Sequence, residues 1–456
     1  MRSVRRLASS WISLAIFVVL CWLLMPPTHA QAQTQGNNAV YSGTNTLTGS
    51  SAFIDASVFS GTDICAKIYS VLTTNYPLFG AVVDARGIST PSTCQNSPWG
   101  QPSNAYANVP SVILLPAGVI TINSTWKLPD HTRIIGEGAG APNSSGPPIT
   151  GTVLAAGSSF SPMIQFGDLS NTICNDGANA GICYGISVEN LALDGAGQNI
   201  TGIFNEHSEE RSYVKQVTLN RITGTGLHIG GPQSQNSGPY SNITFVAGSM
   251  ATSSTVCAEI AADSSGQPPL PLRGIHGLSC TGNSVANSVA VYLDTISTTI
   301  EDVHIDGFYD GILVGANHSA RSDVLFNITG GANVTNLIHI CGSRTAINCP
   351  ATAKTVTDIS VLGVASSAGN TIDDDVTSTT LTNSTDQYVG MYVLGEQVGN
   401  GYSRFSTSPR FPTWIIGSNA ITGNPSCVTG SLYSKTTGTT GTTLWGCVQS
   451  AWTAIR

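Results

Sequence analysis

One short stretch of the sequence concentrates the side chains that can do acid–base chemistry. Residues 205–212 read Asn-Glu-His-Ser-Glu-Glu-Arg-Ser, so three carboxylates, a histidine and an arginine fall within six consecutive positions. Charged residues make up only 10% of the chain, which makes this density unusual. Hydrolysis of a glycosidic bond uses two carboxyl groups across that bond, whereas elimination uses a base that takes a proton. The stretch is therefore the first candidate for a catalytic or sugar-binding cluster.

Each side chain of this cluster can be given a role. The catalytic candidates are Glu206, Glu209, Glu210 and Asp194, the last of which lies 12 residues before Glu206 and can approach from the same turn of the chain. Arg211 is the candidate clamp for a substrate carboxylate, and His207 is a second candidate for substrate binding. The alternative is that the stretch is a solvated turn or an ion pair between neighbouring segments.

Two further regions carry polar or aromatic candidates. Trp445 and Trp452 can face a sugar ring or another chain, or else cover the end of the fold. Asp302, His304, Asp306 and Asp310 form a second constellation, in which His304 is expected to point outward and the two later aspartates to occupy turns. Asp373-Asp374-Asp375 could bind calcium, but a solvated acidic run is the simpler interpretation. We therefore predict no cofactor.

The composition limits which kinds of fold can hold these residues. Hydrophobic residues make up 41% of the 456 positions, so there is enough material for a core, and 49 glycines punctuate the chain. Lys, Glu, Arg and Gln, which favour exposed helix faces, are scarce. A formal net charge of −8 without a basic cluster beyond the first six residues argues against a nucleic-acid partner. We expect a neutral, β-rich protein.

The first 30 residues resemble a secretory signal peptide. Arg2, Arg5 and Arg6 precede an apolar run from Trp11 to Met25, and Thr28-His29-Ala30 offers a cleavage site. This run is shorter than the roughly 20 residues that a membrane span needs, although an uncleaved anchor is the alternative. We expect a secreted, periplasmic or cell-surface protein that keeps no stable membrane span after cleavage.

The cysteines agree with export. Ten of the 11 lie beyond the predicted signal, and an even number in an exported chain indicates disulfides. They fall in sequence-adjacent pairs, and no Cys-x-x-Cys or suitably spaced histidine indicates a metal site. The predicted disulfides are Cys65–Cys94, Cys174–Cys183, Cys257–Cys280, Cys341–Cys349 and Cys427–Cys447.

The chain beyond the signal divides into three parts that differ in composition and in the spacing of apolar residues. Residues 31–60 are polar and predict a flexible lead-in. Residues 63–75 place Ile64, Ile68, Val71 and Leu72 at helical spacing, with Thr62 or Asp63 as the cap. Residues 61–407 form the main domain, and residues 408–456 predict a small β-hairpin element that Cys427–Cys447 would staple.

The main domain repeats short strands without intervening helices. Leu191-Ala192-Leu193, Val217-Thr218-Leu219 and Ile243-Thr244-Phe245 recur at intervals of 26 residues. Val303-His304-Ile305, Ile338-His339-Ile340 and Ile359-Ser360-Val361 continue the pattern at looser intervals. Three short strands per period of this length predict a solenoid, best matched by a parallel β-helix. A two-sheet sandwich is the alternative.

Two segments resemble the first coils of the pectate-lyase superfamily. They are Val112-Ile113-Leu114-Leu115-Pro116-Ala117-Gly118, with its strand and Pro-x-Gly, and Leu128-Pro129 through Ile134-Ile135-Gly136-Glu137-Gly138. The resemblance implies an all-β, right-handed parallel β-helix, in which the helix predicted at residues 63–75 covers the open end of the core.

The resemblance also implies a function, although not a set of catalytic residues. It suggests an exported protein that acts on extracellular polysaccharide as a glycoside hydrolase or a polysaccharide lyase. The chain lacks the Asn-Thr-Asp, Gly-Asp-Asp and Arg-Ile-Lys motifs of polygalacturonases and the Arg-x-Pro-x-x-Arg motif of the main pectate lyases. The alternative is a non-catalytic carbohydrate-binding or surface-adhesion protein built on the same scaffold. The sequence leaves the oligomeric state open.

Overall fold

The structure is a computed structural model of the full chain. It describes residues 52–74, 81–100, 108–168, 173–174, 181–263, 266–267, 271–318, 320–331, 333–341, 348–349, 356–357, 359–366, 368, 370–374, 392–397, 414–417, 432–435, 444–448 and 451–455. The predicted signal peptide and all but the end of the predicted lead-in lie outside these residues. Strand β1 (Ala52–Asp55) and the short helix η1 (Ala56–Val58) already form inside the predicted lead-in.

Two long parallel sheets make up most of the described chain. Sheet A has 15 strands and sheet B has nine, and every pairing among β1 to β26 is parallel. The main path of sheet A runs through β1, β2 (Ala81–Asp84), β4 (Ser111–Leu114), β7 (Arg133–Ile135), β10 (Ser187–Asp194), β12 (Tyr213–Asn220), β14 (Tyr240–Val246), β16 (Ile275–Thr281), β18 (Thr299–Asp306), β21 (Val324–Gly330), β24 (Ser360–Ser366) and β26 (Tyr392–Gln397). A branch of sheet A contains β3 (Ser92–Cys94), β5 (Gly118–Ile122) and β8 (Thr152–Ala156).

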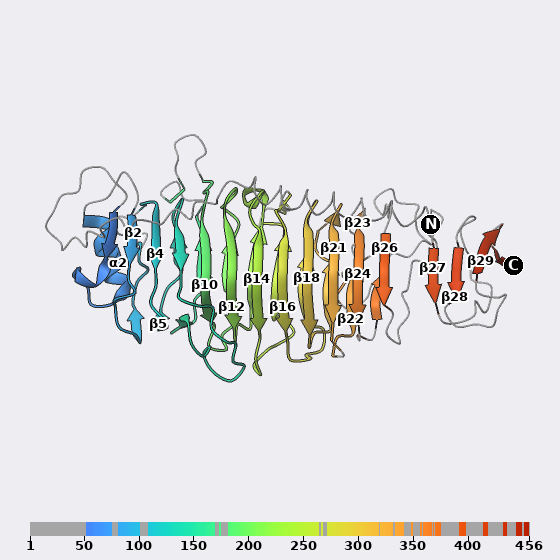
Figure 1. Ribbon diagram of the computed structural model, residues 1–456, viewed down its shortest axis with the longest axis horizontal. Helices are drawn as coiled ribbons and strands as arrows, with labels where there is room; N and C mark the ends of the chain where they lie inside the picture. The colour runs from blue at the N-terminus through green and yellow to red at the C-terminus, as the bar shows by residue number, and fades with distance from the viewer. Residues whose placement is uncertain are drawn as a thin grey trace, which may run out of the picture. The chain divides into compact units, whose positions relative to one another are not determined.

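Sheet B alternates with sheet A along the chain. Its strands, in spatial order, are β6 (Trp126–Leu128), β9 (Ile164–Phe166), β11 (Ile203–Asn205), β13 (Thr225–Gly230), β15 (Val256–Ala261), β17 (Val289–Leu293), β19 (Asp310–Val314), β22 (Asn336–Ile340) and β25 (Asn370–Asp374). A strand of sheet A followed by one of sheet B makes one coil, and each coil stacks on the next (Figure 1). The chain is thus nearly all β with parallel sheets and few helices, which is consistent with a parallel β-helix.

The expected three strands per coil appear as one bent strand and one straight strand. In β10, residues 187–189 pair with β7 whereas residues 192–194 pair with β8. The bend between these two arms falls at Asn190, whose φ is 56°. Equivalent left-handed residues bend the following strands: Gln216, Asn242, Gly277, Asp302 and Asn327. Asn and Asp tolerate this conformation, and Gly adopts it without strain. The left-handed residue bends each strand, so that its two arms lie on two different faces of the coil.

Register confirms the predicted 26-residue repeat and divides the more loosely spaced triplets between the two sheets. Leu191, Val217 and Ile243 pair in successive strands of sheet A, and Val303 follows in the same row after Leu278. Ile338-His339-Ile340, however, belongs to β22 of sheet B. The two sheets carry similar apolar triplets, because both alternate inward apolar and outward polar residues, so sequence spacing alone could not assign this triplet to a sheet.

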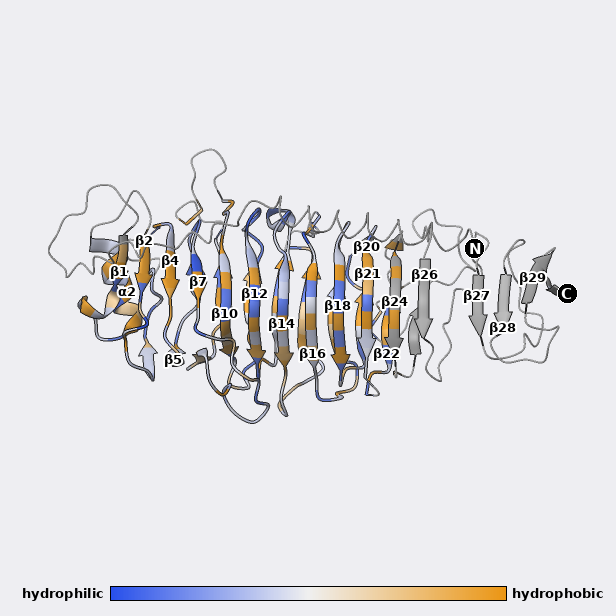
Figure 2. Cartoon of the chain, viewed as in Figure 1, coloured by the Kyte–Doolittle hydropathy of each residue, from blue (hydrophilic) through white to orange (hydrophobic). Residues whose placement is uncertain are grey.

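Apolar side chains fill the space between the sheets. Figure 2 shows hydrophobic and hydrophilic residues alternating along strands such as β16 and β18, whose inward residues are buried. The largest fully buried side chains include Trp99, Trp126, Tyr240, Phe166 and Phe245. Burial of each large apolar side chain contributes roughly 1.5–3 kcal/mol, so this core is the main source of stability.

Helix α2 (Ile64–Thr74) lies at the N-terminal end of the stacked strands (Figure 1). Its buried residues are Ile64, Cys65, Ile68, Val71 and Leu72, which confirms the predicted apolar face. Asp63 caps the helix, because its carboxylate accepts a hydrogen bond of 2.9 Å from the backbone N–H of Ala66. The helix contacts β2 and β3, so it covers apolar core at this end.

Four disulfides join the predicted cysteine partners. They are Cys65–Cys94, Cys174–Cys183, Cys257–Cys280 and Cys341–Cys349. The fifth predicted disulfide, Cys427–Cys447, stays a prediction, because Cys427 lies outside the described residues. Four disulfides indicate an oxidising, extracellular type of environment. Within the described residues, no helix is long and apolar enough to cross a membrane.

The C-terminal strands form a sheet of their own. It contains β27 (Trp414–Gly417), β28 (Leu432–Lys435), β29 (Leu444–Val448) and β30 (Ala451–Ile455). Strands β28 and β29 pair antiparallel, and β30 adds a second antiparallel pairing. The two-residue strands β20 (Ala320–Arg321) and β23 (Val356–Thr357) form a separate, parallel two-stranded sheet.

Candidate functional site

A row of polar and aromatic side chains crosses the outward face of sheet B. Register places Phe204, His228, Glu259 and Tyr292 at equivalent positions in β11, β13, β15 and β17. The residues on both sides of each in its strand are buried, whereas these four are only partly buried. Because side chains alternate between the two faces of a strand, all four project away from the core. The row is therefore a surface built from four successive coils.

His228 lies between two glutamates on this face. Its Nε2 is 2.9 Å from Oε1 of Glu206, which directly follows β11, and its Nδ1 is 3.0 Å from Oε2 of Glu259. The exposed fractions of the side chains are 13% for His228, 15% for Glu206 and 28% for Glu259. Phe204 stacks on the imidazole, with ring centroids 4.7 Å apart and an angle of 6° between the planes. Two carboxylates thus meet at one histidine without being fully withdrawn from solvent.

The glutamates decide the charge of His228. Burial favours the neutral imidazole, but the hydrogen bonds to Glu206 and Glu259 outweigh it and raise the pKa of His228 to about 9. At neutral pH the ring is therefore an imidazolium that donates one N–H to each carboxylate. Gly230 leaves room for this contact, because a Cβ there would lie 2.8 Å from His228 Nε2.

The row continues on both sides of the histidine. Towards the N-terminus, Lys127 forms an ion pair with Asp168, which follows β9. Towards the C-terminus, burial raises the pKa of the Tyr292 hydroxyl to about 12. Asp294, just after β17, is fully buried; burial raises its pKa to about 7, although backbone N–H groups such as that of Asn317 partly oppose this. The face therefore combines cationic, anionic, aromatic and protonated groups.

The structure brings only some of the predicted cluster to this face. Glu206 takes part in it, and His207 contacts Phe204 edge-on, with ring centroids 6.3 Å apart. Burial lowers the pKa of His207, so its imidazole is neutral at neutral pH. The Nδ1 atom of His207 is buried without a hydrogen-bond partner. His207 therefore lies beside the outward row rather than in it.

The other residues of the predicted cluster lie in the turn between β11 and β12. Glu209 is buried and accepts a hydrogen bond of 3.0 Å from Gln235, while Glu210 accepts one of 3.1 Å from Asn236. Burial raises the pKa of Glu209. Arg211 is exposed, with a left-handed φ of 64°. Each of the two glutamates is thus paired with an amide of the loop between β13 and β14.

Asp194 does not join Glu206. It ends β10 on sheet A, is 1% exposed and forms an ion pair with Arg221 in the next coil, with Nε 2.9 Å from Oδ1. The amide of Asn220 donates a further hydrogen bond of 3.2 Å to it. Asp194 therefore links two coils on the other sheet.

The second predicted constellation separates in the structure. His304 is exposed, as expected, and Asp306 precedes Gly307, whose φ of 72° marks a turn. Asp310 was expected in a turn, but it begins β19 and is fully buried. Its carboxylate accepts hydrogen bonds from the side chains of Asn336 and Asn348, which offset the cost of burial.

Several candidates fall outside the described side chains. Trp445 and Trp452 belong to β29 and β30, but the structure describes only their backbone. The same holds for Asp373 and Asp374 in β25, and Asp375 is not described. Their proposed roles in sugar or calcium binding stay predictions.

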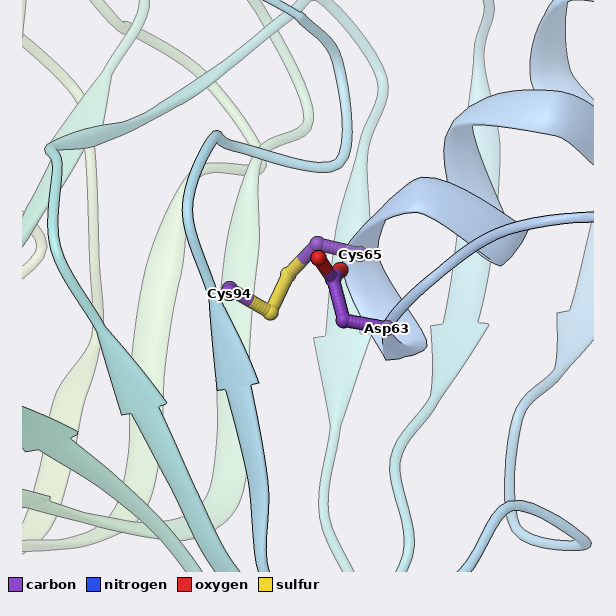
Figure 3. A group of neighbouring side chains, drawn as sticks. All are labelled: Asp63, Cys65 and Cys94. Carbon is purple, nitrogen blue, oxygen red and sulfur yellow. A yellow bond between two sulfur atoms is a disulfide. The ribbon is translucent and has the colours of Figure 1, made fainter.

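Within the described part of the chain, one group of three potential metal ligands lies close together. It consists of Asp63, Cys65 and Cys94. The two sulfurs are joined in a disulfide, and the carboxylate of Asp63 caps helix α2 (Figure 3). A disulfide sulfur lacks the thiolate charge that binds metals, so this group is structural.

Sequence reasoning missed His228 and Glu259. A dense local cluster is the signal that the sequence offers at Glu206, whereas His228 and Glu259 lie 22 and 53 positions after Glu206 in separate strands. The available signal was a single polar residue inside an apolar strand, as in Leu227-His228-Ile229 and Ala258-Glu259-Ile260. Aligning such triplets coil by coil would have placed them side by side.

The chain shows no match to a protein-family model or to a curated protein sequence. Among solved structures, it is similar to the A-module of a mannuronan C-5 epimerase from Azotobacter vinelandii, with 14% identity over 63% of this chain and 87% of that one and a TM-score of 0.30. It is also similar to ORF18 of Geobacillus virus E2, with 11% identity over 75% of this chain and 62% of that one and a TM-score of 0.33. A third similar structure is a DFA-IIIase from Arthrobacter chlorophenolicus A6 in complex with GF2, with 13% identity over 74% of this chain and 91% of that one and a TM-score of 0.26. At such identities and scores, the chain's function has to be argued from its own residues.

Proposed function

We propose that this protein is an exported, right-handed parallel β-helix that hydrolyses extracellular polysaccharide at the outward face of sheet B. The observation that carries the proposal is the contact of His228 with both Glu206 and Glu259. It supplies two carboxyl groups and a proton on one partly exposed face, next to the aromatic ring of Phe204. Aromatic faces and carboxylates suit a sugar, which presents C–H groups on its ring faces and hydroxyls at its edges. The right-handed winding follows the strong preference of parallel strand connections.

The pair of carboxyl groups favours hydrolysis over elimination. Elimination needs a base, but His228 is protonated below its pKa of about 9 and Tyr292 below about 12. The carboxylates remain as bases, and a pair of carboxyl groups is the equipment of a glycoside hydrolase.

The three groups can supply an acid and a base together. The imidazolium of His228 holds two N–H protons, one directed at each glutamate. If one proton moves onto its partner carboxylate, that carboxyl group becomes the acid for the leaving oxygen, and the ring becomes neutral. The second glutamate stays ionised and can activate water or attack the sugar. Glu259 is the more exposed of the two, so we assign it the direct contact with substrate.

A non-catalytic, carbohydrate-binding role is the second candidate. It is favoured by the mutual pairing of the same groups, because both ring nitrogens of His228 are already occupied by hydrogen bonds. In that case the face would bind sugar without breaking a bond.

The test separates the two functions. The purified protein is incubated with a panel of polysaccharides, and reducing ends and unsaturated products are measured for the wild type, Glu206→Gln, Glu259→Gln and Glu210→Gln. Hydrolysis predicts reducing ends that are lost in the first two variants and kept in the third, whose carboxylate contacts Asn236 in a turn. Binding without release from any polymer supports the second candidate, and unsaturated products would show that elimination occurs instead.

A further inference from the structure

The charges on the outward face of sheet B bear on the class of polysaccharide that it can accept. Two cations and three anions line the row from β6 to β15. The cations are Lys127 and His228, and the anions are Asp168, Glu206 and Glu259. Both cations are already in contact with carboxylates of the row, and His228 contacts two of them. The face is therefore negative overall.

A further carboxylate lies beside the same site. Asp263 approaches Gly231, because a Cβ built on that glycine would lie 2.8 Å from the Cβ of Asp263. Gly231 follows Gly230, which in turn packs against Glu206 and His228. Asp263 thus adds negative charge near the paired glutamates.

The arginine that sequence reasoning assigned to a substrate carboxylate is placed elsewhere. Arg211 lies in the turn between β11 and β12, outside the strands of sheet B. Glu210, an acidic residue, directly precedes it in the sequence. A guanidinium binds a carboxylate best, because it can donate two parallel hydrogen bonds to it. Arg211 is not in the row and does not supply this group there.

We propose that the site takes a neutral polysaccharide and discriminates against uronic-acid polymers. This inference rests on the proposed function, because it names the substrate class of the same site. A uronan carries a carboxylate on each sugar, and these would approach Glu206, Glu259 and Asp263, while Lys127 and His228, the two cations of the row, already contact carboxylates of the protein. Hydroxyl groups of a neutral sugar can instead donate hydrogen bonds to the glutamates, while the partly exposed rings of Phe204 and Tyr292 offer apolar surface. Like charges placed against each other are an effective way to reject a wrong ligand.

Binding to soluble polymers at low salt tests the substrate class. The probes are a neutral set (β-glucan, xylan, mannan and levan), a uronan set (polygalacturonate and alginate) and chitosan as an amino-sugar polymer. We expect at least one neutral polymer to bind about ten-fold or more tightly than either uronan, and added salt to narrow that ratio because it screens repulsion. Glu259→Gln should weaken the discrimination about three-fold or more, whereas Glu210→Gln, the same change of charge in the turn, should leave it unaltered.

Each other outcome counts against the inference in a recognisable way. Tighter binding of a uronan than of any neutral polymer would overturn the substrate class, and so would uronan binding that Arg211→Ala abolishes. Preference for chitosan over every neutral polymer would also overturn it. If uronan is hydrolysed and Glu259→Gln stops this, the proposed function stands and only the substrate class fails. Failure to bind any polymer of the panel would overturn both.

Discussion

Two histidines occupy the same row of sheet B but have opposite environments. His228 in β13 and His339 in β22 are connected through the register of Glu259, Tyr292 and Leu313. His228 is partly exposed between two glutamates, whereas His339 is 2% exposed and its Nδ1 is 3.1 Å from Oδ1 of the fully buried Asp310. A histidine–carboxylate contact is therefore not by itself a sign of a functional site.

What differs is the structure that covers each part of the row. Beyond β17, Leu313 is buried in a small apolar cluster with Cys341 and Cys349, and Tyr292 packs against this cluster. The Cys349 sulfur lies 3.5 Å from Nε2 of His339. At β11 to β15, the glutamates keep exposed surface. Cys341 and Cys349 thus pack against the row at Leu313, whereas Glu206 and Glu259 keep surface that a ligand can reach.

The largest effect on stability is expected at the covered histidine. Asp310→Ala removes the buried carboxylate that the side chains of Asn336, Asn348 and His339 contact and should lower the free energy of unfolding by about 3–5 kcal/mol. Urea denaturation measures this loss. Asp310→Asn, which keeps the shape and one oxygen acceptor, should cost less than the alanine variant. A loss below about 1 kcal/mol for Asp310→Ala would mean that this pair does not hold the later coils together.

At the open end of the row, the largest effect should be on activity. Glu259→Gln removes a carboxylate that contacts His228 and is expected to reduce kcat/KM about 10²–10⁴-fold on a polysaccharide that the wild type cleaves. Its free energy of unfolding should fall by less than half as much as in Asp310→Ala, because Glu259 is partly exposed. Equal losses of stability in the two variants would show that the two ends of the row have the same structural role.

The sequence predicts the scaffold better than it predicts this division of the row. The helix at residues 64–74, the parallel strands and the four disulfides depend on local apolar patterns and on the distance between cysteines, which are visible along the chain. Which polar residue becomes a site depends on coil stacking, which brings Glu206 to Glu259 across 53 positions. It also depends on which other segments bury a polar residue, as happens at Asp310. The identity of the residue alone does not predict this burial. Glu206, Glu209 and Glu210 lie in the same turn after β11, but Glu206 contacts His228 of β13, whereas Glu209 and Glu210 contact Gln235 and Asn236.

The pH dependence of stability should distinguish the two histidines as well. The pKa of His228 is raised to about 9 in the folded protein, against about 6.5 for an unperturbed histidine. Its stabilising contribution is therefore fully present below about pH 6.5 and is lost as pH rises through about 9. The expected loss across this window is about 3 kcal/mol.

Denaturation curves measured between pH 6 and 10 for the wild type and His228→Gln isolate this contribution. Asp294, whose pKa is raised to about 7, also titrates in the window, but it is present in both proteins. The difference between the two proteins should shrink by the stated amount as pH rises. A difference that is independent of pH would show that His228 is neutral in the folded protein.

The smallest effects are expected in the turn that the sequence first indicated. Glu210→Gln replaces a carboxylate whose described contact is the amide of Asn236, and it should change kcat/KM less than about three-fold and the free energy of unfolding by no more than about 0.5 kcal/mol. Glu209→Gln should also leave kcat/KM nearly unchanged. A small loss of stability is expected, because Glu209 is buried and accepts a hydrogen bond from the side-chain amide of Gln235. Both variants are measured beside Glu259→Gln on the same substrate. A loss of 100-fold or more in Glu210→Gln, with Glu259→Gln active, would move the active site from the outward face of sheet B to the turn after β11. The dense acidic run, rather than the register between coils, would then be the better guide to chemistry on this scaffold.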